Sequence, residues 1–282
     1  MSEPSAESLM TWRFIRRHSV RIVGGAVLVT AVSIAVFVWM PYQRELRIAR
    51  KIEAVGGKVD FQFCGPSWIP QLIRKTVPLF DRIQYVNLHG TEAVPADVLA
   101  EFGSLHGLEG LGLGGTQIAG LEQLKGIVRF NVLVLSGTKV TDAGLEHVQG
   151  LRNLKDLQLY ETHVTDAGLE HLKGLTSLRI LHIRGTPIDG TGLAFLKGFS
   201  NLRWLCLSDS GITDAGLEHL NHLTSLEELW LDGTHVTNVG LKHLEGMTGL
   251  RKLNLPSEPQ TTASGRATLR KALPGCVITP EP

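Results

Sequence analysis

Aromatic side chains are scarce in this sequence, at 6% of its 282 residues. A conventional globular core takes much of its buried area from Phe, Tyr and Trp, so this scarcity argues against a single packed core. Glycine is abundant by contrast, with 31 residues, and leucine recurs at fixed intervals. Together these features favour a repetitive fold.

Cysteine is scarcer still, with only Cys64, Cys206 and Cys276 in the whole chain. None belongs to a CxxC pair or has the spacing of a zinc finger, so the sequence predicts neither a metal site nor a cofactor. An odd number of cysteines does not favour a disulfide framework. We interpret the three as small thiols that are buried or half-buried.

An excess of charge of one sign is also missing, since 28 Lys and Arg residues and 27 Asp and Glu residues give a net charge of +1. We therefore expect no nucleic-acid partner, because nucleic acids are bound by strongly basic surfaces. The phosphate-loop, HExxH, kinase and hydrolase-elbow motifs are absent from the sequence as well. We expect a protein that binds and is not an enzyme.

One long apolar run is present over residues 22–40, where 19 residues carry no charge. A helix of that length spans about 28 Å, close to the roughly 30 Å hydrocarbon core of a bilayer. A cleaved signal peptide would need a shorter apolar core and small residues before the cleavage site, whereas this run ends in bulky residues. We predict a single-pass signal anchor in the lipid bilayer; a buried core helix is the alternative.

The charges beside this run leave its orientation open, because the positive-inside rule gives a tie. A 21-residue tail is simple to retain in the cytoplasm, so we favour a cell-membrane protein with its large carboxyl-terminal part on the non-cytoplasmic side. Four basic residues lie on each side of the run: Arg13, Arg16, Arg17 and Arg21 before it, and Arg44, Arg47, Arg50 and Lys51 after it.

A repeat of 24 residues occupies most of the remaining chain. Each unit has apolar residues at its start, three positions on and five positions on, which predicts a short strand with alternate side chains turned inward. Two earlier units begin at Ile83 and Leu108, and the second of these is two residues short. The regular units begin at Phe130, Leu154, Leu178, Leu202, Leu226 and Leu250.

The second half of each unit carries a hydroxyl and then a Thr-Asp-Ala-Gly-Leu segment or a variant of it. We expect the hydroxyls of Thr162, Thr186, Ser210 and Thr234 to bond backbone groups at the turn after the strand. We also expect Asp142, Asp166 and Asp214 to act as N-caps of short helices. No single unit can bury its own leucines, so the units must stack into a continuous core.

The LxxLxLxxTxITDxGLxxL pattern resembles leucine-rich repeats of the cysteine-containing type, over about residues 81–278. The whole layout resembles bacterial membrane-anchored leucine-rich-repeat proteins. The resemblance implies an α/β solenoid with parallel strands on the concave face, short helices on the convex face and an amino-terminal transmembrane helix. Related repeats occur in F-box substrate adaptors, but this chain has no room for an F-box, so that role does not transfer.

The predicted organisation has six parts: a tail over 1–21, the anchor over 22–40, an amphipathic stalk helix over 41–58, an amino-terminal cap over 59–82, the repeats over 83–255 and a carboxyl-terminal cap over 256–282. In the first cap we expect a strand over 58–63 and a short helix over 70–75. In the second we expect a helix over 263–273 and a strand over 276–278. Caps are needed because a solenoid otherwise exposes an apolar end.

The strand positions not used for the core predict where a partner binds. They gather aromatic side chains, with charged residues around them, over four adjacent strands, which is the composition of a binding hot spot. The flanking strands have fewer such residues, with Gly110 and Gly112 on one side and Lys252 and Asn254 on the other. The predicted contact residues are Tyr160, Ile180, His182, Arg184, Trp204, Cys206, Asp209, Trp230 and Asp232.

We therefore predict a membrane-tethered module that recognises a protein partner through its concave face. A first alternative is a scaffold or envelope spacer that binds nothing specific. A second is an enzyme built on His182 and Cys206, which occupy the same outward position on adjacent strands and could form the start of a nucleophilic site. A column of histidines one repeat apart, at 147, 171, 219 and 243, is interpreted as repeat consensus, because such spacing is too wide for one metal ion.

Overall fold

A computed structural model describes residues 38–65, 81–124, 127 and 129–280 of the chain. The chain divides into two units, Met1–Arg47 with Phe63–Arg82, and Ile48–Gln62 with Ile83–Pro282. The predicted helix over 70–75 and residues 22–37 of the predicted anchor lie outside the described residues. Within the described residues no helix is both long and apolar enough to span a bilayer. In the first unit, Arg82 Nε lies 3.6 Å from Glu45 Oε1.

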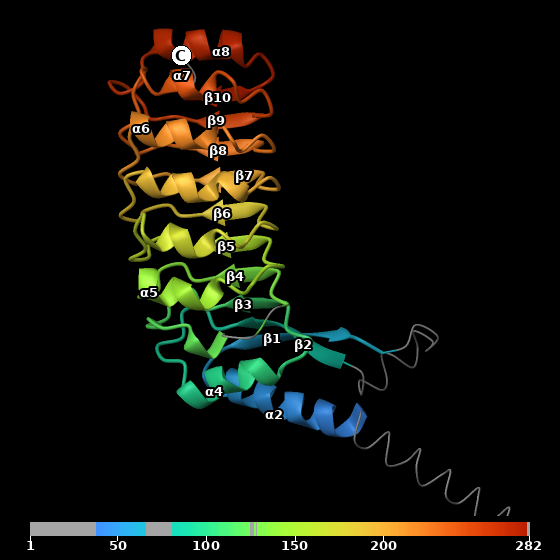
Figure 1. Cartoon of the computed structure of the whole chain (residues 1–282). Helices are drawn as coiled ribbons and strands as arrows, with labels where there is room; N and C mark the ends of the chain where they lie inside the picture. Colours follow the sequence, from blue (N-terminus) through green and yellow to red (C-terminus); the bar gives the residue numbers. More distant parts are fainter. Residues whose placement is uncertain (1–37, 66–80, 125–126, 128, 281–282) are drawn as a thin grey trace, which may run out of the picture. The chain divides into compact units, whose positions relative to one another are not determined.

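A ten-stranded sheet runs through the second unit with its strands in chain order (Figure 1). The described registers from β2 to β10 are all parallel. The bounds are β1 Lys58–Phe63, β2 Asp81–Asn87, β3 Gly110–Gly112, β4 Val132–Val134, β5 Asp156–Gln158, β6 Ile180–His182, β7 Trp204–Cys206, β8 Glu228–Trp230, β9 Lys252–Asn254 and β10 Val277–Thr279.

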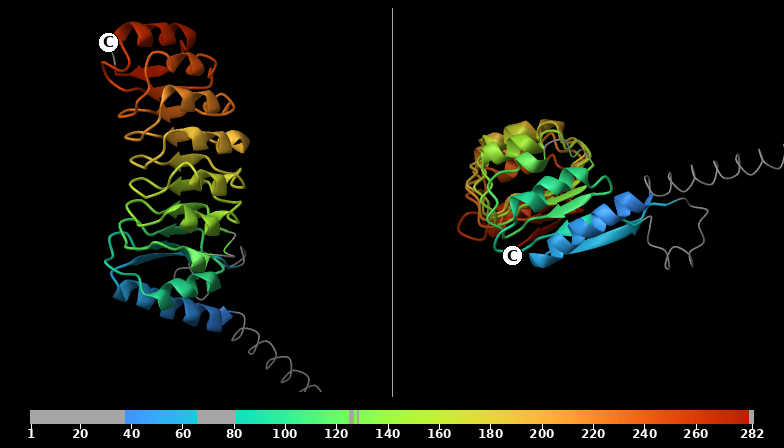
Figure 2. Two further views of the ribbon diagram at one scale, coloured as in Figure 1. Left: turned by 60° about the vertical axis from the view of Figure 1, so that its left-hand side comes forward. Right: turned by 90° about the horizontal axis from the view of Figure 1, so that it is seen from below.

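Each turn of the chain also contributes a short helix on the side opposite its strand (Figures 1 and 2). Many of these are 3-10 turns, labelled η. The described helices are α2 Met40–Ala54, α4 Ala96–Glu101, η3 Phe102–Ser104, η4 Glu122–Leu124, α5 Asp142–Leu145, η5 Glu146–Val148, η6 Gly168–Leu172, η7 Thr191–Gly198, α6 Asp214–Leu217, η8 Glu218–Leu220, α7 Leu241–Leu244 and α8 Ala263–Ala272. The arrangement is the predicted α/β solenoid.

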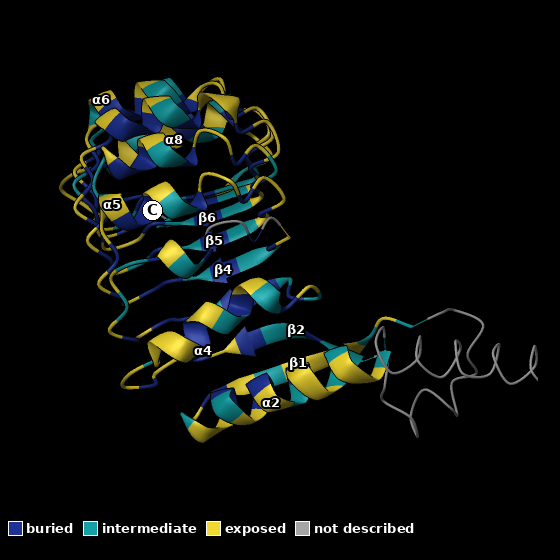
Figure 3. Cartoon of the chain, turned by 60° about the horizontal axis from the view of Figure 1, so that its bottom comes forward, coloured by how far each residue is buried: buried dark blue, intermediate teal, exposed yellow. Residues whose placement is uncertain are grey.

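The core is a stack of leucines between the sheet and the helices, where Figure 3 shows the buried residues. Leu157, Leu181 and Leu205 are register partners on β5, β6 and β7, and all three are fully buried. This column confirms the predicted strand phase. Because every leucine packs on its counterparts in the next repeats, the core is continuous along the solenoid.

The turn after each strand is closed by a buried hydroxyl, as expected. The Thr162 Oγ1 hydroxyl donates to the Leu159 carbonyl at 2.7 Å, and Thr186 Oγ1 donates to the Ile183 carbonyl at 2.6 Å. Thr234 makes the same bond to Leu231, also at 2.6 Å, and Ser210 does so to Leu207. Each buried hydroxyl thus donates to a carbonyl within its own repeat and does not depend on a neighbouring repeat for its hydrogen bond.

The predicted N-cap role of the repeat aspartates is wrong. The residue at the cap position of α5 is Thr141, and its side chain makes no capping bond. The Asp142 carboxylate instead accepts two bonds from the next repeat, from Thr165 N at 2.7 Å and from Thr165 Oγ1 at 2.6 Å. Asp214 accepts the same pair of bonds from Thr237. These aspartates therefore join successive repeats.

Asp166 makes a related bond to the next repeat, although that repeat lacks a threonine at the matching position. Its carboxylate accepts from the backbone N–H groups of Asp189 at 2.7 Å and Gly192 at 2.6 Å. The aspartate bonds between repeats are thus retained even where the Thr-Asp-Ala-Gly-Leu segment is replaced by a variant. Charge-assisted bonds of this kind are stronger than bonds between neutral groups.

Residues from position 48 onward in α2 pack in the solenoid and do not form a separate stalk, contrary to the prediction for 41–58. Ile48 and Ile52 are fully buried, and Ala49 is 4% exposed. Lys51 Nζ lies 3.1 Å from Asp97 and 2.5 Å from Glu101, both on α4. This part of α2 covers the apolar end of the stack. At the other end, α8 and β10 match the helix and strand expected in the carboxyl-terminal cap.

Candidate functional site

The outer face of the sheet carries three columns of side chains, because residues alternate between core and surface along each strand. Ile180 and Trp204 are partners in the first column. His182, Cys206 and Trp230 are successive partners in the second. Tyr160, Arg184 and Asp232 lie in the third column. Asp209 directly follows Ser208, which holds the third-column position of its own repeat. The structure thus brings all nine predicted contact residues onto four adjacent repeats.

Four rings on this face form a continuous series, which we call the aromatic ladder: Tyr160, His182, Trp204 and Trp230. The ring centroids are 5.1 Å apart for Tyr160 and His182, and 5.0 Å apart for His182 and Trp204. The two tryptophans follow at 6.4 Å. All four rings are half-buried, so each keeps an accessible edge or face while its neighbours hold it in place.

The ladder ends in a lysine that the sequence analysis assigned to a flanking strand and not to the contact residues. Lys252 on β9 places Nζ 4.6 Å from the centre of the Trp230 ring, a cation–π contact. The signal was available, because Lys252 occupies the same outward position as Trp204 in the 24-residue repeat. It was not counted among the contact residues because a lone exposed lysine carries no pattern of its own.

Charged groups border the ladder, as predicted. Arg184 Nη2 lies 2.7 Å from Asp209 Oδ2, and both side chains are about half exposed. Asp232 Oδ1 accepts from Ser208 Oγ at 2.5 Å and from Asn254 Nδ2 at 2.8 Å. Asp232 is therefore held in place by two neighbours, whereas the exposed Arg184–Asp209 pair can exchange its partners at little cost.

Cys206 does not belong to the accessible surface, although we predicted it among the contact residues. It is 3% exposed. The reason is its register, since the small thiol side chain lies between the larger His182 and Trp230 on the neighbouring strands. Its Sγ lies 3.5 Å from the Ser208 hydroxyl. Cys206 therefore fills the space between two members of the ladder and is not available to a partner.

The environment of Cys206 does not favour a nucleophile. Burial raises the pKa of the Cys206 thiol, and the bond to Ser208 lowers it by a smaller amount. Burial, followed by the charge of Arg184, lowers the pKa of His182. A reactive cysteine needs the opposite arrangement, a thiolate stabilised by a nearby cation. Of the features that a Cys–His dyad needs, the structure shows only that His182 and Cys206 are register partners on adjacent strands.

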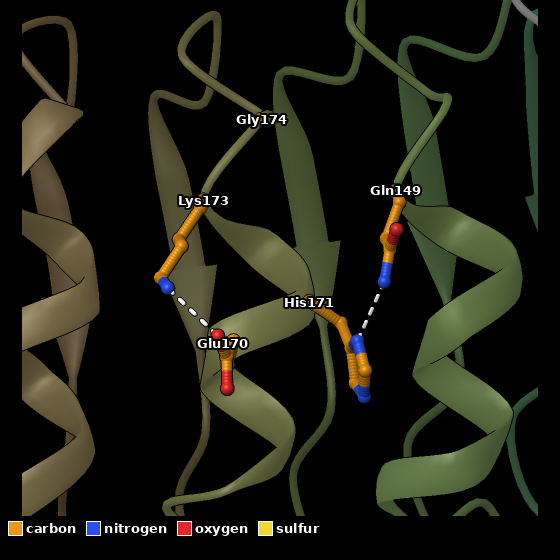
Figure 4. A pocket seen from close by; sticks show the side chains of 5 residues that line it. All are labelled: Gln149, Glu170, His171, Lys173 and Gly174. Atoms are coloured by element: carbon orange, nitrogen blue, oxygen red, sulfur yellow. Dashed lines mark hydrogen bonds and ion pairs between the residues drawn. The ribbon is translucent and has the colours of Figure 1, made fainter.

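The histidine column lies on the helix side, where three of its four members contact side chains of the preceding repeat. His147 Nε2 is 3.9 Å from Glu122 and His243 Nε2 is 3.8 Å from Glu218. His171 Nδ1 is 2.6 Å from Gln149 Nε2, beside a surface hollow (Figure 4). Within the described residues no cluster of His, Cys, Asp or Glu could hold a metal ion.

Two glycines, one on β3 and one just after it, are covered by side chains on and just after β2. A Cβ on Gly110 would lie 2.1 Å from the Tyr85 ring, and one on Gly114 would lie 2.5 Å from the His89 ring. Both glycines therefore make room for a ring of the preceding turn of the chain. Tyr85 and His89 lie outside the aromatic ladder.

Comparison with known proteins supports leucine-rich repeats. The family described as "Leucine Rich repeat" matches residues 174–197, one unit of the repeat. The solved structure of internalin C2 from Listeria monocytogenes aligns with a TM-score of 0.56 and 25% identity over 70% of this chain and 81% of that one. The search of curated proteins found no match.

Two further solved structures resemble the chain more weakly. An internalin F structure from Listeria monocytogenes has a TM-score of 0.45 at 20% identity, covering 69% of this chain and 65% of that one. A leucine-rich-repeat protein of Leptospira interrogans has a TM-score of 0.42 at 19% identity, covering 69% of this chain and 60% of that one. The family match and the alignment with internalin C2 show that the chain has a leucine-rich-repeat solenoid fold.

Proposed function

We propose that this chain is a membrane-tethered recognition protein that binds a protein partner through the aromatic ladder. The observation that carries the proposal is the unbroken contact of four half-buried rings across four repeats, ending in a lysine over Trp230. Aromatic side chains held rigidly by their neighbours lose little conformational entropy on binding, which makes them effective anchors. A spacer without a partner has no need of such a surface.

The fold supports the same proposal. A parallel sheet that continues through all repeats presents a wide, rigid surface to a large partner, and solenoids use such surfaces for binding. The likeness to internalin C2 supports a bacterial leucine-rich-repeat protein of this type. The raised pKa and the burial of the Cys206 thiol favour this binding function over a cysteine-dependent enzyme.

The binding experiment uses Trp204→Ala and Trp230→Ala, singly and together. Each single change is expected to weaken binding of the partner by about 2 kcal/mol or more, because tryptophans at the centre of an interface contribute most of its affinity. Both side chains are half-buried on the outer face, so folding should be largely retained. The measurement is quantitative capture of native partners by the purified full chain, with circular dichroism to confirm folding.

Tyr85→Ala serves as the matched control, since Tyr85 is an aromatic on the same face but lies outside the ladder. Partners that bind the wild type and the Tyr85 variant, and are lost from both tryptophan variants, support the proposal. Equal capture by the double tryptophan variant would contradict binding at the ladder and move the site to the helix side.

The membrane tether is the second part of the proposal and rests on the uncharged run over 22–40. We propose that this segment anchors the chain and that the solenoid lies on the non-cytoplasmic side. Mass spectrometry of the mature protein should find the tail over 1–21 retained; a mature amino terminus near residue 41 would contradict the anchor. Protease added to spheroplasts should digest the repeats without lysis, and digestion only after lysis would place them in the cytoplasm.

A further inference from the structure

The outer sheet face differs in charge between its two edges. The strands are parallel, so the residue before each strand lies at one common edge of the face. Over β5 to β9 this edge, which we call the basic edge, has four basic residues and one acidic residue, a net charge of +3. Its members are Lys155, Arg179, Arg203, Glu227 and Arg251.

Most of the positive charge at the basic edge is available to a partner. Arg203 lies 2.9 Å from Glu227, and Arg251 lies 3.9 Å from the same carboxylate, so one acid is shared by two bases. Lys155 and Arg179 are exposed and have no ion pair in the described part of the chain. Their charges are open to solvent.

The opposite edge, at the strand ends, carries acidic residues at positions where the backbone adopts a conformation that is unfavourable for residues other than glycine. Glu161 and Asp209 have φ values of 55° and 53°. The matching positions of other repeats hold glycine, as in Gly137, Gly185 and Gly233, all with positive φ. An L-residue in this left-handed region costs about 1–2 kcal/mol. These two carboxylates are therefore present at a cost to stability, which is a common property of functional positions.

The ladder lies between these edges, on columns of residues that carry little net charge. The first column over the same strands contains Asp156, Glu228 and Lys252, a net charge of −1. In the third column the charges of Arg184 and Asp232 balance. The strand-end edge, with Glu161 and Asp209, has a net charge of −2. The positive end of the face is thus confined to the strand starts.

We infer that the partner presents a protein segment of complementary polarity, with carboxylates over Lys155 and Arg179 and an apolar anchor against Trp204 and Ile180. This inference rests on the proposed function and adds the chemistry of the partner and its orientation. Complementary charges steer association and fix register more than they add affinity. A uniformly anionic glycan fits less well, since Glu161 and Asp209 repel it and the rings offer it no matching charge.

The test is a random peptide display selection against the purified full chain. Peptides are retained that bind the wild type and fail to bind the Trp204→Ala/Trp230→Ala variant. These ladder-dependent peptides should be enriched in Asp and Glu beside an apolar residue. Their affinity should fall at least about tenfold in the Lys155→Glu/Arg179→Glu variant, because like charges then face each other. It should recover when the peptide carboxylates are replaced by lysine.

Lys197→Glu is the matched control, because Lys197 is exposed on η7, away from the sheet face. Ladder-dependent peptides that lack acidic residues, or that ignore the charge reversal, would overturn the inference and leave the proposed function standing. Failure to select any ladder-dependent peptide would count against both. Heparin is added as a polyanion probe; tight binding that needs Lys155 and Arg179 but neither tryptophan would replace the protein segment with a glycan.

Discussion

At the scale of single residues, burial decides what each side chain on the sheet face can do. Cys206 and Trp204 differ by two positions on one strand, yet the thiol is 3% exposed and the indole is half-buried. The sequence predicted that both point outward, which is correct. It could not predict that Cys206 is covered, because coverage depends on the sizes of side chains one repeat away in space.

The thiol of Cys206 should react slowly. Burial raises its pKa, so at neutral pH an even smaller fraction is thiolate than for an ordinary cysteine. Cys64 is exposed, so the prediction of a buried or half-buried thiol is wrong for this residue. Timed alkylation with mass spectrometry should show Cys206 modified well after Cys64, and at a rate that rises as the pH is raised or the protein unfolds. Fast alkylation of native Cys206 near pH ~6 would contradict this account and favour a catalytic thiolate.

Glu161 offers a second test at this scale. Glu161→Gly should raise the free energy of unfolding by up to about 1 kcal/mol, because glycine adopts positive φ without the steric cost but loses more chain entropy on folding. Urea denaturation measures the change. Glu170→Gly, within η6, is the comparison and should lower stability by about as much. Destabilisation by Glu161→Gly would show that the carboxylate itself contributes to folding.

At the scale of elements, the 24-residue period predicts the strands well, because alternate burial leaves a clear trace in the sequence. The strand phase around Leu157, Leu181 and Leu205 followed directly from it. The role of Asp142 could not be predicted in the same way, since its partner, Thr165, is reached only when repeats stack. The packing of Ile48 and Ile52 against the stack was missed for a similar reason, because their amphipathic pattern suits a free stalk equally well.

The leucine column makes a direct prediction about stability. Leu181→Ala should cost about 2–5 kcal/mol of unfolding free energy, through lost burial and the cavity that remains. Since β6 is held by β5 and β7, hydrogen exchange should speed up in those strands too. Ile180→Ala, a neighbouring change on the outer face, should cost much less. A loss below roughly 1 kcal/mol for Leu181→Ala would contradict the packing described here.

At the scale of the whole molecule, the solenoid separates its tasks by face. The leucines inside and the aspartates between repeats hold the stack together, and neither group is needed on the outer sheet face. The outer face can therefore hold the partly exposed rings of the ladder and the carboxylates at positive φ without disturbing the core. The net charge of +1 gives no sign of the charge difference between the edges of this face, because positive and negative groups are nearly equal in number and differ in position.

The central claim is that the partner contacts the outer sheet face at the ladder. Site-specific photo-crosslinking tests it most directly, with a photoreactive residue placed at Gln158 on β5 or, for comparison, at Glu146 on the helix side. In living cells, position 158 should yield a discrete adduct with a partner protein, and that adduct should disappear when Trp204 and Trp230 are replaced by alanine. Position 146 should yield none. An adduct from position 146 that persists without the two tryptophans, together with none from position 158, would contradict the account.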